Sequence, residues 1–508
     1  MPESLIRAIR RAFTLVAATL LVLLGALPAD SSGAAPVSAL QFDHLVFKGA
    51  GGEPDMAISP SGRVMLVGGL GPDKPAALYR STNSGKTFTK LSPSFSRVGG
   101  EDWDMYLLDD HTVVAADDTI GHGIYVHRST DAGLHWTTTT IETDQYDRPW
   151  LDHFGRDLVY VVAKGFDGLP YLFRSTDGGA SFGAPPIPLI VYGEPGSGGP
   201  DPATGLFANQ NGYVDHLVVD HRTGDVYVLY GIGAPSSYNT SQPLGASNQL
   251  YVAHLEQGRF VSHAVYLGGP GDSFISGFNW MTVDRAGTVY VLCDGRINGH
   301  HSARLSYSKN HGRTWSNLVD IAPPGAANVY GAISAASPGV LALAYIRGSN
   351  EDPSTPQPWF AEMARVTGAD TPSPKVNKVR AVAQPIHLED ICFDGILCGL
   401  PGFGNDRNLL DFIWVSVDPS GRSFGVFASD GPATGNSSGQ TPDVILLRQT
   451  SGTTLPSPAP APKLKVLATK TTRSRSLAAT GIGDGTVVGG ALLAALAAGL
   501  AGRLRRFR

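Results

Sequence analysis

The sequence predicts an all-β protein folded as a seven-bladed β-propeller, and three observations support that fold class. Of the 508 residues, 42% are hydrophobic and 16% are charged, while 62 glycines and 36 prolines are typical of many short turns. A pattern of strand, turn and strand recurs seven times, and a polar octet built around glycine recurs four times. Units of this kind bury their apolar faces by packing around an axis.

Each repeating unit consists of two apolar strands joined by a turn, within a repeat of about 55 residues. The seven units are Met56–Gly69, Met105–Asp118, Leu151–Gly165, Leu217–Gly231, Met281–Gly295, Ala332–Gly348 and Phe412–Asp430. Further strands are expected at Leu250–Leu255, Trp359–Ala364 and Val444–Leu447, in units that lack an octet. A six-bladed propeller is the alternative, if one unit is a hairpin outside the ring.

The four octets share serine at the first position, Asp or Asn at the third and glycine at the fifth. Their third positions are Asn83, Asp131, Asp177 and Asn310. An Asp or Asn side chain at this place accepts hydrogen bonds from turn amides, and glycine permits a positive φ. Each octet therefore predicts an outer hairpin turn with a structural role, and we assign it no catalytic one.

Residues just before the innermost strand of each unit are expected to line one mouth of the central channel. These positions are rich in acids and aromatics, namely Glu53, Asp102, Trp103, Asp104, Asp147, Trp150, Asp215, Asn279, Trp280, Asp406 and Asp411. Such a ring would bind a sugar by stacking on tryptophan while carboxylates hold its hydroxyls, or would bind a calcium ion through oxygen ligands. The alternative is that these acids cap turns in solvated loops.

The octets resemble the Asp-boxes (BNR repeats) of the sialidase-like propellers, and Asp147–Trp150 resembles the D-[RK]-P-W entry found in many of those repeat proteins. For catalytic members, the resemblance implies an arginine triad that clamps the substrate carboxylate, an Asp acid/base, and a Tyr nucleophile activated by Glu. Arg148 and Arg407 are candidate clamps, with Arg296 and Arg347 as further possibilities. Tyr330 is the candidate nucleophile and Asp152 a further catalytic candidate. The sequence lacks the family's Arg-Ile-Pro motif.

Both ends of the chain have the features of sorting signals. Three arginines followed by an apolar run and small residues predict a signal peptide over residues 1–34. Near the other end, the apolar run Thr486–Gly502 is long enough to cross a bilayer and is followed by arginines. The preceding Leu477–Gly481 reads LAATG, which resembles the LAxTG signal of sortases in high-GC Gram-positive bacteria.

The sorting resemblance implies cleavage after Thr480, before Gly481, and attachment to peptidoglycan. Sortase and peptidoglycan are then partners, and the membrane is contacted only through the C-terminal helix before sorting. On this interpretation residues 35–450 form the propeller, 451–476 a basic Pro/Ala/Thr-rich linker through the wall, and 477–508 the sorting signal, transmembrane helix and basic tail. An ordinary membrane anchor is the alternative.

Charge argues against a nucleic-acid partner. The chain carries −5, but residues 1–34 contribute +1, residues 451–480 +5 and residues 481–508 +3, which leaves −14 on residues 35–450. Phosphate contacts need a basic face. The same charge repels an anionic sugar at long range.

We therefore expect an exported, wall-displayed propeller that binds a glycan or a surface protein at its channel mouth without catalysis, with calcium as the one candidate cofactor. Exo-α-sialidase-like glycoside hydrolysis is the alternative. Cys392 and Cys398 are close enough to form a disulfide in an oxidising compartment, although buried reduced thiols remain the alternative.

Overall fold

The computed structural model describes residues 39–455 apart from 72–73, 92–101, 120–122, 143–145, 166–169, 190–212, 233–247, 270, 275–277, 394–397, 402–403 and 438. The expected signal peptide and the sorting residues Leu477, Thr480 and Gly481 lie outside these residues. Within the described part of the chain, no helix has the length and apolarity to cross a membrane.

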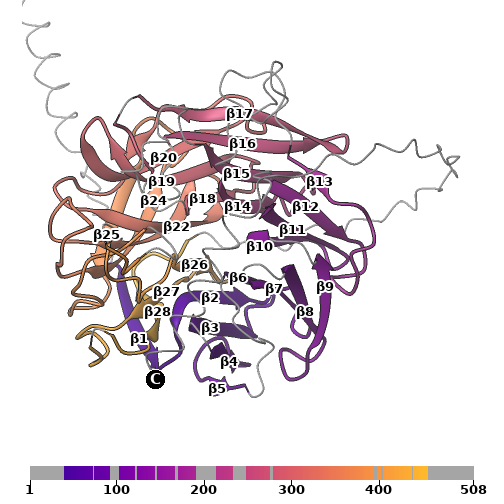
Figure 1. The fold of residues 1–508 in the computed structure, drawn as a ribbon, viewed down its shortest axis with the longest axis horizontal. Helices are drawn as coiled ribbons and strands as arrows, with labels where there is room; N and C mark the ends of the chain where they lie inside the picture. The colour runs from indigo at the N-terminus through magenta and orange to yellow at the C-terminus, as the bar shows by residue number, and fades with distance from the viewer. Residues whose placement is uncertain are drawn as a thin grey trace, which may run out of the picture. The chain divides into compact units, whose positions relative to one another are not determined.

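Seven four-stranded antiparallel sheets are arranged around a central axis (Figure 1). From the innermost strand outward, the first blade is β2 (Gly52–Ile58), β3 (Met65–Gly71), β4 (Lys74–Ser81) and β5 (Thr89–Lys90). The second is β6 (Trp103–Leu107), β7 (Val113–Thr119), β8 (Gly123–Ser129) and β9 (Thr137–Glu142). The third is β10 (Tyr146–Phe154), β11 (Leu158–Gly165), β12 (Pro170–Ser175) and β13 (Ile187–Pro188).

The fourth blade is β14 (Tyr213–Val219), β15 (Val226–Ile232), β16 (Gln249–Glu256) and β17 (Arg259–Leu267). The fifth is β18 (Trp280–Val283), β19 (Val289–Ile297), β20 (His300–Ser308) and β21 (Val319–Asp320). The sixth is β22 (Asn328–Ser337), β23 (Val340–Arg347), β24 (Phe360–Thr367) and β25 (Lys375–Arg380). The seventh is β26 (Trp414–Val417), β27 (Ser423–Ser429), β28 (Asp443–Ser451) and β1 (Gln41–Phe47).

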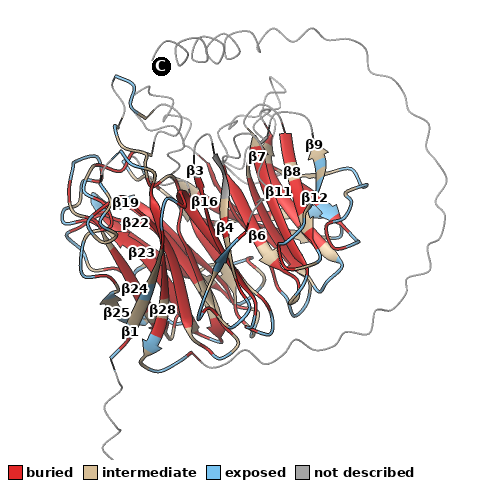
Figure 2. Cartoon of the chain, turned by 90° about the horizontal axis from the view of Figure 1, so that it is seen from below, coloured by how far each residue is buried: buried red, intermediate tan, exposed pale blue. Residues whose placement is uncertain are grey.

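The seven-bladed prediction is confirmed, and the six-bladed alternative is wrong. Each predicted unit supplies the first two strands of one blade, and the additional predicted strands correspond to β16, β24 and β28. Each innermost strand contacts the next, and β26 contacts β2. The strands are buried along most of their length, while exposed residues lie mainly in turns and outer strands (Figure 2).

The ring closes because the first strand of the chain joins the last blade, a pairing that the sequence patterns do not reveal. The N-terminal strand β1 pairs antiparallel with β28 and becomes the outer strand of the last blade. Arg448 Nη2 donates to Asp43 Oδ2 over 2.5 Å, and Arg448 Nη1 donates to the Gly85 carbonyl of the first blade over 3.1 Å. Residues from both ends of the described chain therefore hold the seventh blade together.

The octets form the turns between third and fourth strands, with the hydrogen bonds expected of their residues. Asp177 Oδ1 accepts from the Ser181 amide over 2.9 Å, and Asn310 Oδ1 accepts from the Thr314 amide over 2.9 Å. The fifth-position glycines have φ between +74° and +87°. These contacts are internal to each turn, which agrees with a structural role.

Three aspartates clamp successive blades together. Asp55 Oδ2 accepts from the Met105 amide over 2.8 Å, Asp104 Oδ2 from the Leu151 amide over 2.7 Å, and Asp152 Oδ2 from the Val219 amide over 2.6 Å. Each carboxyl thus joins one innermost strand to the innermost strand of the following blade. Asp104 is 1% exposed, so the side chain expected to bind ligand instead serves the neighbouring backbone.

Asp104→Ala is expected to destabilise the propeller by about 1–3 kcal/mol, because the buried Leu151 amide would lose its acceptor. Asp104→Asn keeps an oxygen at that place and is expected to cost less. Urea unfolding measures both changes. Asp157→Ala is the control, since Asp157 is exposed in the turn after β10. Equal losses for Asp104→Ala and Asp157→Ala would contradict the clamp.

Candidate functional site at the channel mouth

Strained residues occupy the same place at the start of three innermost strands. Glu53 in β2, Arg148 in β10 and Tyr330 in β22 have positive φ values of 43°, 56° and 52°. At each of these places the register shifts so that two residues oppose one on the partner strand, which defines a β-bulge. A positive φ is costly for non-glycine residues, and such strain clusters at functional sites. The bulges turn three polar side chains toward one mouth of the channel.

Side chains from several blades converge at this mouth. The set comprises Glu53, Asp102, Asp118, Asp147, Arg148, Asp215, Tyr330, Arg407 and Asp411, and is called the acidic mouth below. Glu53, Asp102 and Asp411 each place a carboxylate oxygen within 4.8 Å of the other two. Asp102, Asp118 and Asp147 meet the same condition. Seven acidic or phenolic groups therefore face two arginines.

The two arginines are held differently. Arg407 Nη2 donates to Asp411 Oδ2 over 2.5 Å, and 26% of the Arg407 side chain is exposed. The Arg148 guanidinium carbon lies 4.0 Å from the centroid of the Phe278 ring, which is a cation–π contact. Both guanidinium groups also act electrostatically on Asp102. The mouth thus combines positive donors with a larger number of acids.

Burial and mutual repulsion raise the pKa values of several of these acids. Burial raises the pKa of Glu53 well above its usual range, and the charges of Asp102 and Asp411 raise it further. Burial likewise raises the pKa of Asp102, with Asp147 and Asp411 adding to the effect and the two arginines opposing it. Burial also raises the pKa of Asp215 to about 8. Protonated carboxyls donate and ionised ones accept, so both kinds of hydrogen bond are available.

Buried polar atoms of the mouth include some without a hydrogen-bond partner among the described residues. Glu53 Oε2, Asp215 Oδ1 and the Tyr330 hydroxyl are such atoms, in residues that are at most 2% exposed. An unpaired buried polar atom costs about 1–3 kcal/mol. Groups of this kind in a native fold call for an explanation such as a bound ligand, ion or water.

The residues expected to bind ligand do not all lie in this mouth. Asp102, Asp147, Asp215, Arg148, Arg407 and Tyr330 do. Trp103, Trp150 and Trp280 are 1%, 2% and 3% exposed, and Trp103 Nε1 donates to the Glu53 carbonyl over 2.8 Å. The indoles of Trp150 and Trp280 pack edge to face with centroids 5.7 Å apart. These tryptophans support the mouth from within the core and do not offer an exposed stacking surface.

Asp152 lies four residues beyond Arg148, at a different level of the channel. There a cavity of about 210 Å³ is lined by residues of all seven innermost strands and by His221. Asp152 Oδ1 contacts His221 Nε2 at 2.9 Å. Burial tends to raise the pKa of Asp152, but His221 and the hydrogen bond it makes lower it overall. Asp152 is thus separated from the arginines and Tyr330 with which it was grouped as a catalytic candidate.

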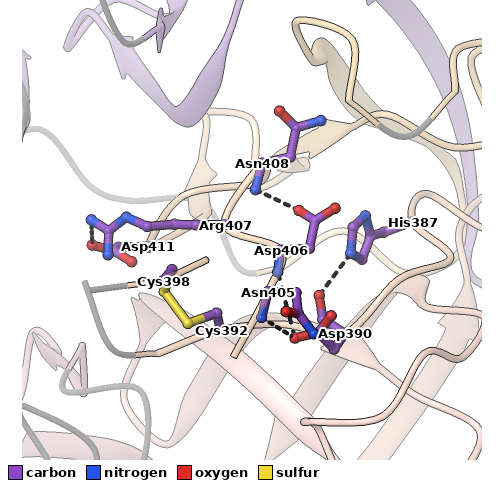
Figure 3. The surroundings of a disulfide bond; sticks show 9 residues. All are labelled: His387, Asp390, Cys392, Cys398, Asn405, Asp406, Arg407, Asn408 and Asp411. Atoms are coloured by element: carbon purple, nitrogen blue, oxygen red, sulfur yellow. Dashed lines mark hydrogen bonds and ion pairs between the residues drawn. A yellow bond between two sulfur atoms is a disulfide. The ribbon is translucent and has the colours of Figure 1, made fainter. Parts of the chain in front are cut away.

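Asp406 lies beside His387, whereas the side chain of its neighbour Arg407 extends in another direction, to Asp411 (Figure 3). Asp406 Oδ1 accepts from the Asn408 amide over 2.7 Å, and its side chain belongs to a cluster with His387 and Asp430. The nearby Cys392 and Cys398 form a disulfide, which decides between the two alternatives that the sequence left open, and Cys293 is a buried free thiol.

Arg296 and Arg347, the two further candidates for a substrate clamp, do not belong to the acidic mouth. Arg347 Nη1 donates to the Pro323 carbonyl over 2.7 Å and to Asn328 Oδ1 over 2.8 Å, so its guanidinium is engaged in structural contacts. Arg296 is exposed on β19, which is the second strand of its blade. The Tyr330 hydroxyl makes no hydrogen bond to a glutamate in the described structure.

Asp118 and Asp294 were missed because they lie on the second strands of their blades, β7 and β19. Both raise the pKa of acids in the mouth, Asp118 that of Glu53 and Asp294 that of Asp215. Neither residue stands just before an innermost strand, where the mouth residues were expected. The signal that both share is an aspartate near the end of the second strand of its unit.

No protein-family profile and no curated protein matches the sequence. Solved structures do resemble it. An ulvan lyase of polysaccharide lyase family PL25 matches with a TM-score of 0.47 and 10% identity, over 81% of this chain and 97% of that one. The GH74 xyloglucanase from Xanthomonas campestris matches with a TM-score of 0.43 and 15% identity, over 80% and 55%. The Hadza microbial sialidase Hz136 matches with a TM-score of 0.31 and 11% identity, over 66% and 73%. Likeness this distant does not extend to ligands or chemistry.

Asp215→Asn is expected to stabilise the protein at pH 8 relative to the natural chain, with little effect at pH 4. The folded-state pKa of Asp215 is about 8, against an ordinary 3.8. Because the folded state retains a proton that the unfolded state releases, the stability associated with this group is present below about pH 4 and is lost as the pH rises toward 8. Asn does not titrate and keeps the acceptor for Asn279, whose Nδ2 donates over 2.9 Å. Thermal unfolding at pH 4, 6 and 8 measures the effect. The prediction is contradicted if the stability gained by Asp215→Asn does not increase with pH. It is also contradicted if Asp157→Asn, at an exposed position, gives the same gain.

Proposed function

We propose that the protein is a surface-displayed binding propeller whose acidic mouth holds a neutral or amino sugar of a glycan. The observation that carries the proposal is the set of buried, unpartnered atoms on Glu53, Asp215 and Tyr330. Sugar hydroxyls both donate and accept, so they match a mouth that offers protonated acids, carboxylates and arginine donors. An amino sugar would add a positive charge opposite the excess of acids.

Display at the cell surface rests on the chain ends. The predicted signal peptide and the LAATG motif, apolar run and basic tail support export followed by sortase attachment to peptidoglycan. The basic linker would cross the wall and present the propeller outside it. The charge of residues 35–450 favours neutral or cationic ligands over anionic ones.

Calcium fits the same mouth by donor chemistry. Glu53, Asp102 and Asp411 would hold it, since carboxylate oxygens are the ligands that calcium takes in proteins. When bound, the ion would offset part of the acid excess and accept a sugar hydroxyl as a further oxygen ligand. The Arg407 guanidinium, which already pairs with Asp411, competes for one of these carboxylates.

The full-length protein is expected to bind neutral oligosaccharides or N-acetylglucosamine and glucosamine oligomers more tightly than sialyllactose. Asp102→Ala and Arg148→Ala are each expected to weaken that binding at least about tenfold, because each removes a hydrogen-bonding side chain, and a hydrogen bond to a charged group contributes about 1.5–3 kcal/mol. Glycan arrays followed by calorimetry measure the affinities. The matched controls are Asp157→Ala and Arg63→Ala, on exposed residues away from the mouth.

The competing hydrolase hypothesis is tested with a fluorogenic sialoside. Release of the fluorophore by the natural chain, lost in both Arg148→Ala and Arg407→Ala, would overturn the non-catalytic proposal. Preferential binding of sialyllactose would overturn the neutral-ligand part of it.

Added calcium is expected to raise the thermal unfolding midpoint of chelator-treated protein, because an ion that binds only the folded state stabilises it by about 2.7 kcal/mol at a hundredfold excess over Kd. Glu53→Gln should abolish the rise. Asp131→Asn, in an octet turn, should leave it unchanged. Identical midpoints with calcium and with chelator would exclude calcium from the mouth and leave the sugar-binding proposal to its own test.

A further inference from the structure

A second cluster of metal-ligand side chains lies where the fourth and fifth blades meet, away from the channel mouth. Asp225 belongs to the turn between β14 and β15, His254 lies on β16, and His311 lies in the octet turn that follows β20. Each offers one ligand atom, and these atoms all lie within 4.8 Å of one another. We propose that Asp225, His254 and His311 form a transition-metal site, best suited to zinc, that joins these two blades.

The distances fit tetrahedral zinc. With ligand bonds of about 2.0–2.1 Å, two ligands of a tetrahedral ion lie about 3.3–3.4 Å apart. Asp225 Oδ1 is 3.4 Å from His254 Nε2, and Asp225 Oδ2 is 3.5 Å from His311 Nδ1. One carboxylate thus faces both imidazoles at nearly the required spacing. Small movements of the side chains would bring the ligands into a zinc sphere.

His254 is oriented as a zinc ligand requires. It is 8% exposed, and its Nε2 atom is buried without a hydrogen-bond partner among the described residues. Its other nitrogen, Nδ1, contacts Glu256 Oε1 at 3.1 Å, and Arg313 Nη2 donates to the same carboxylate oxygen over 2.9 Å. A proton on Nδ1 donated to Glu256 leaves the Nε2 lone pair directed at the cluster. A carboxylate behind a ligating histidine is the usual outer partner in zinc sites.

The aromatic rings of Tyr227, His254 and His311 stack on one another in the cluster. The Tyr227 ring stacks on His254 with centroids 4.7 Å apart, and His254 stacks on His311 at 5.8 Å. The Tyr227 hydroxyl contacts His311 Nδ1 at 3.1 Å, and in the tautomer of His311 with its proton on Nε2 this nitrogen carries the lone pair that a metal ion needs. Tyr227 or water would complete the fourth position. The His311 side chain is 45% exposed and that of Asp225 31%, which leaves an entry path from solvent.

The octet repeat shows that His311 is not required for the turn. The fourth position of the other three octets is Ser84, Ala132 or Gly178, and Ala132 has a φ of 58° against 59° for His311. The turn therefore forms without an imidazole. A His311→Ala variant places at this position the residue that the second blade already carries.

The test uses the full-length protein stripped of metal with a chelator and then titrated with Zn²⁺ by calorimetry and with Co²⁺ by visible absorption. We expect one equivalent of Zn²⁺, d–d bands of four-coordinate Co²⁺, and a higher unfolding midpoint with metal. His311→Ala and Asp225→Asn should each weaken Zn²⁺ binding at least tenfold. Loss of one ligand should also remove the tetrahedral Co²⁺ spectrum.

Three controls separate this site from others. His300→Ala, which removes an imidazole that is 74% exposed, and Glu53→Gln at the acidic mouth should retain the natural Zn²⁺ affinity. His311→Ala without metal should unfold at the same midpoint as metal-free natural protein, because Ala suits the turn. Unchanged Zn²⁺ affinity in His311→Ala, or no Zn²⁺ binding by the natural chain, would overturn the proposal.

Discussion

The closure of the ring by backbone pairing between β1 and β28 is the constraint on which the other features depend. Each blade covers its apolar faces only with its two neighbours, so an open ring would expose a face and a sheet edge. Closure brings the segment before β26 against the first blade, where the Glu53 amide donates to the Leu409 carbonyl over 3.2 Å. The meeting of Glu53 with Asp411 exists only in the closed ring. The position of Glu53 relative to Asp411 in the acidic mouth therefore depends on the pairing of β1 with β28.

The acidic mouth combines two unfavourable features in one place. Glu53, Arg148 and Tyr330 hold strained backbone conformations, and acids that repel one another are buried beside them. Neither feature improves packing, and the surrounding blades, clamped by Asp55, Asp104 and Asp152, supply the rigidity that maintains them. Next to the mouth, Trp103, Trp150 and Trp280 are buried in the core and support it.

Local patterns predicted the blades because strand pairing within a blade depends on residues close in sequence. Alternating apolar strands and turn-forming octets were enough to place all seven units. Six of the candidate site residues lie together in the acidic mouth, while their roles stay predictions: Asp102, Asp147, Asp215, Arg148, Tyr330 and Arg407. The expected roles of the tryptophans failed for a physical reason. A large aromatic beside a strand entry fits either a sugar platform or the core, and only the neighbouring blade, absent from the local pattern, covers Trp103 and Trp150.

The sequence by itself determined the all-β class, the repeated strand pairs and the octet turns, because each depends on short-range spacing or on residue type. It left open whether the ring has six or seven blades and whether Cys392 pairs with Cys398, and the tertiary structure decided both. The tertiary structure alone decided which polar groups meet. Asp406 and Arg407 are adjacent in the chain yet face different clusters, while Asp225 and His311 lie far apart in the chain and face each other. Side-chain direction at a bulge or turn, and the contact of one blade with the next, are set by packing between units, which no single repeat records.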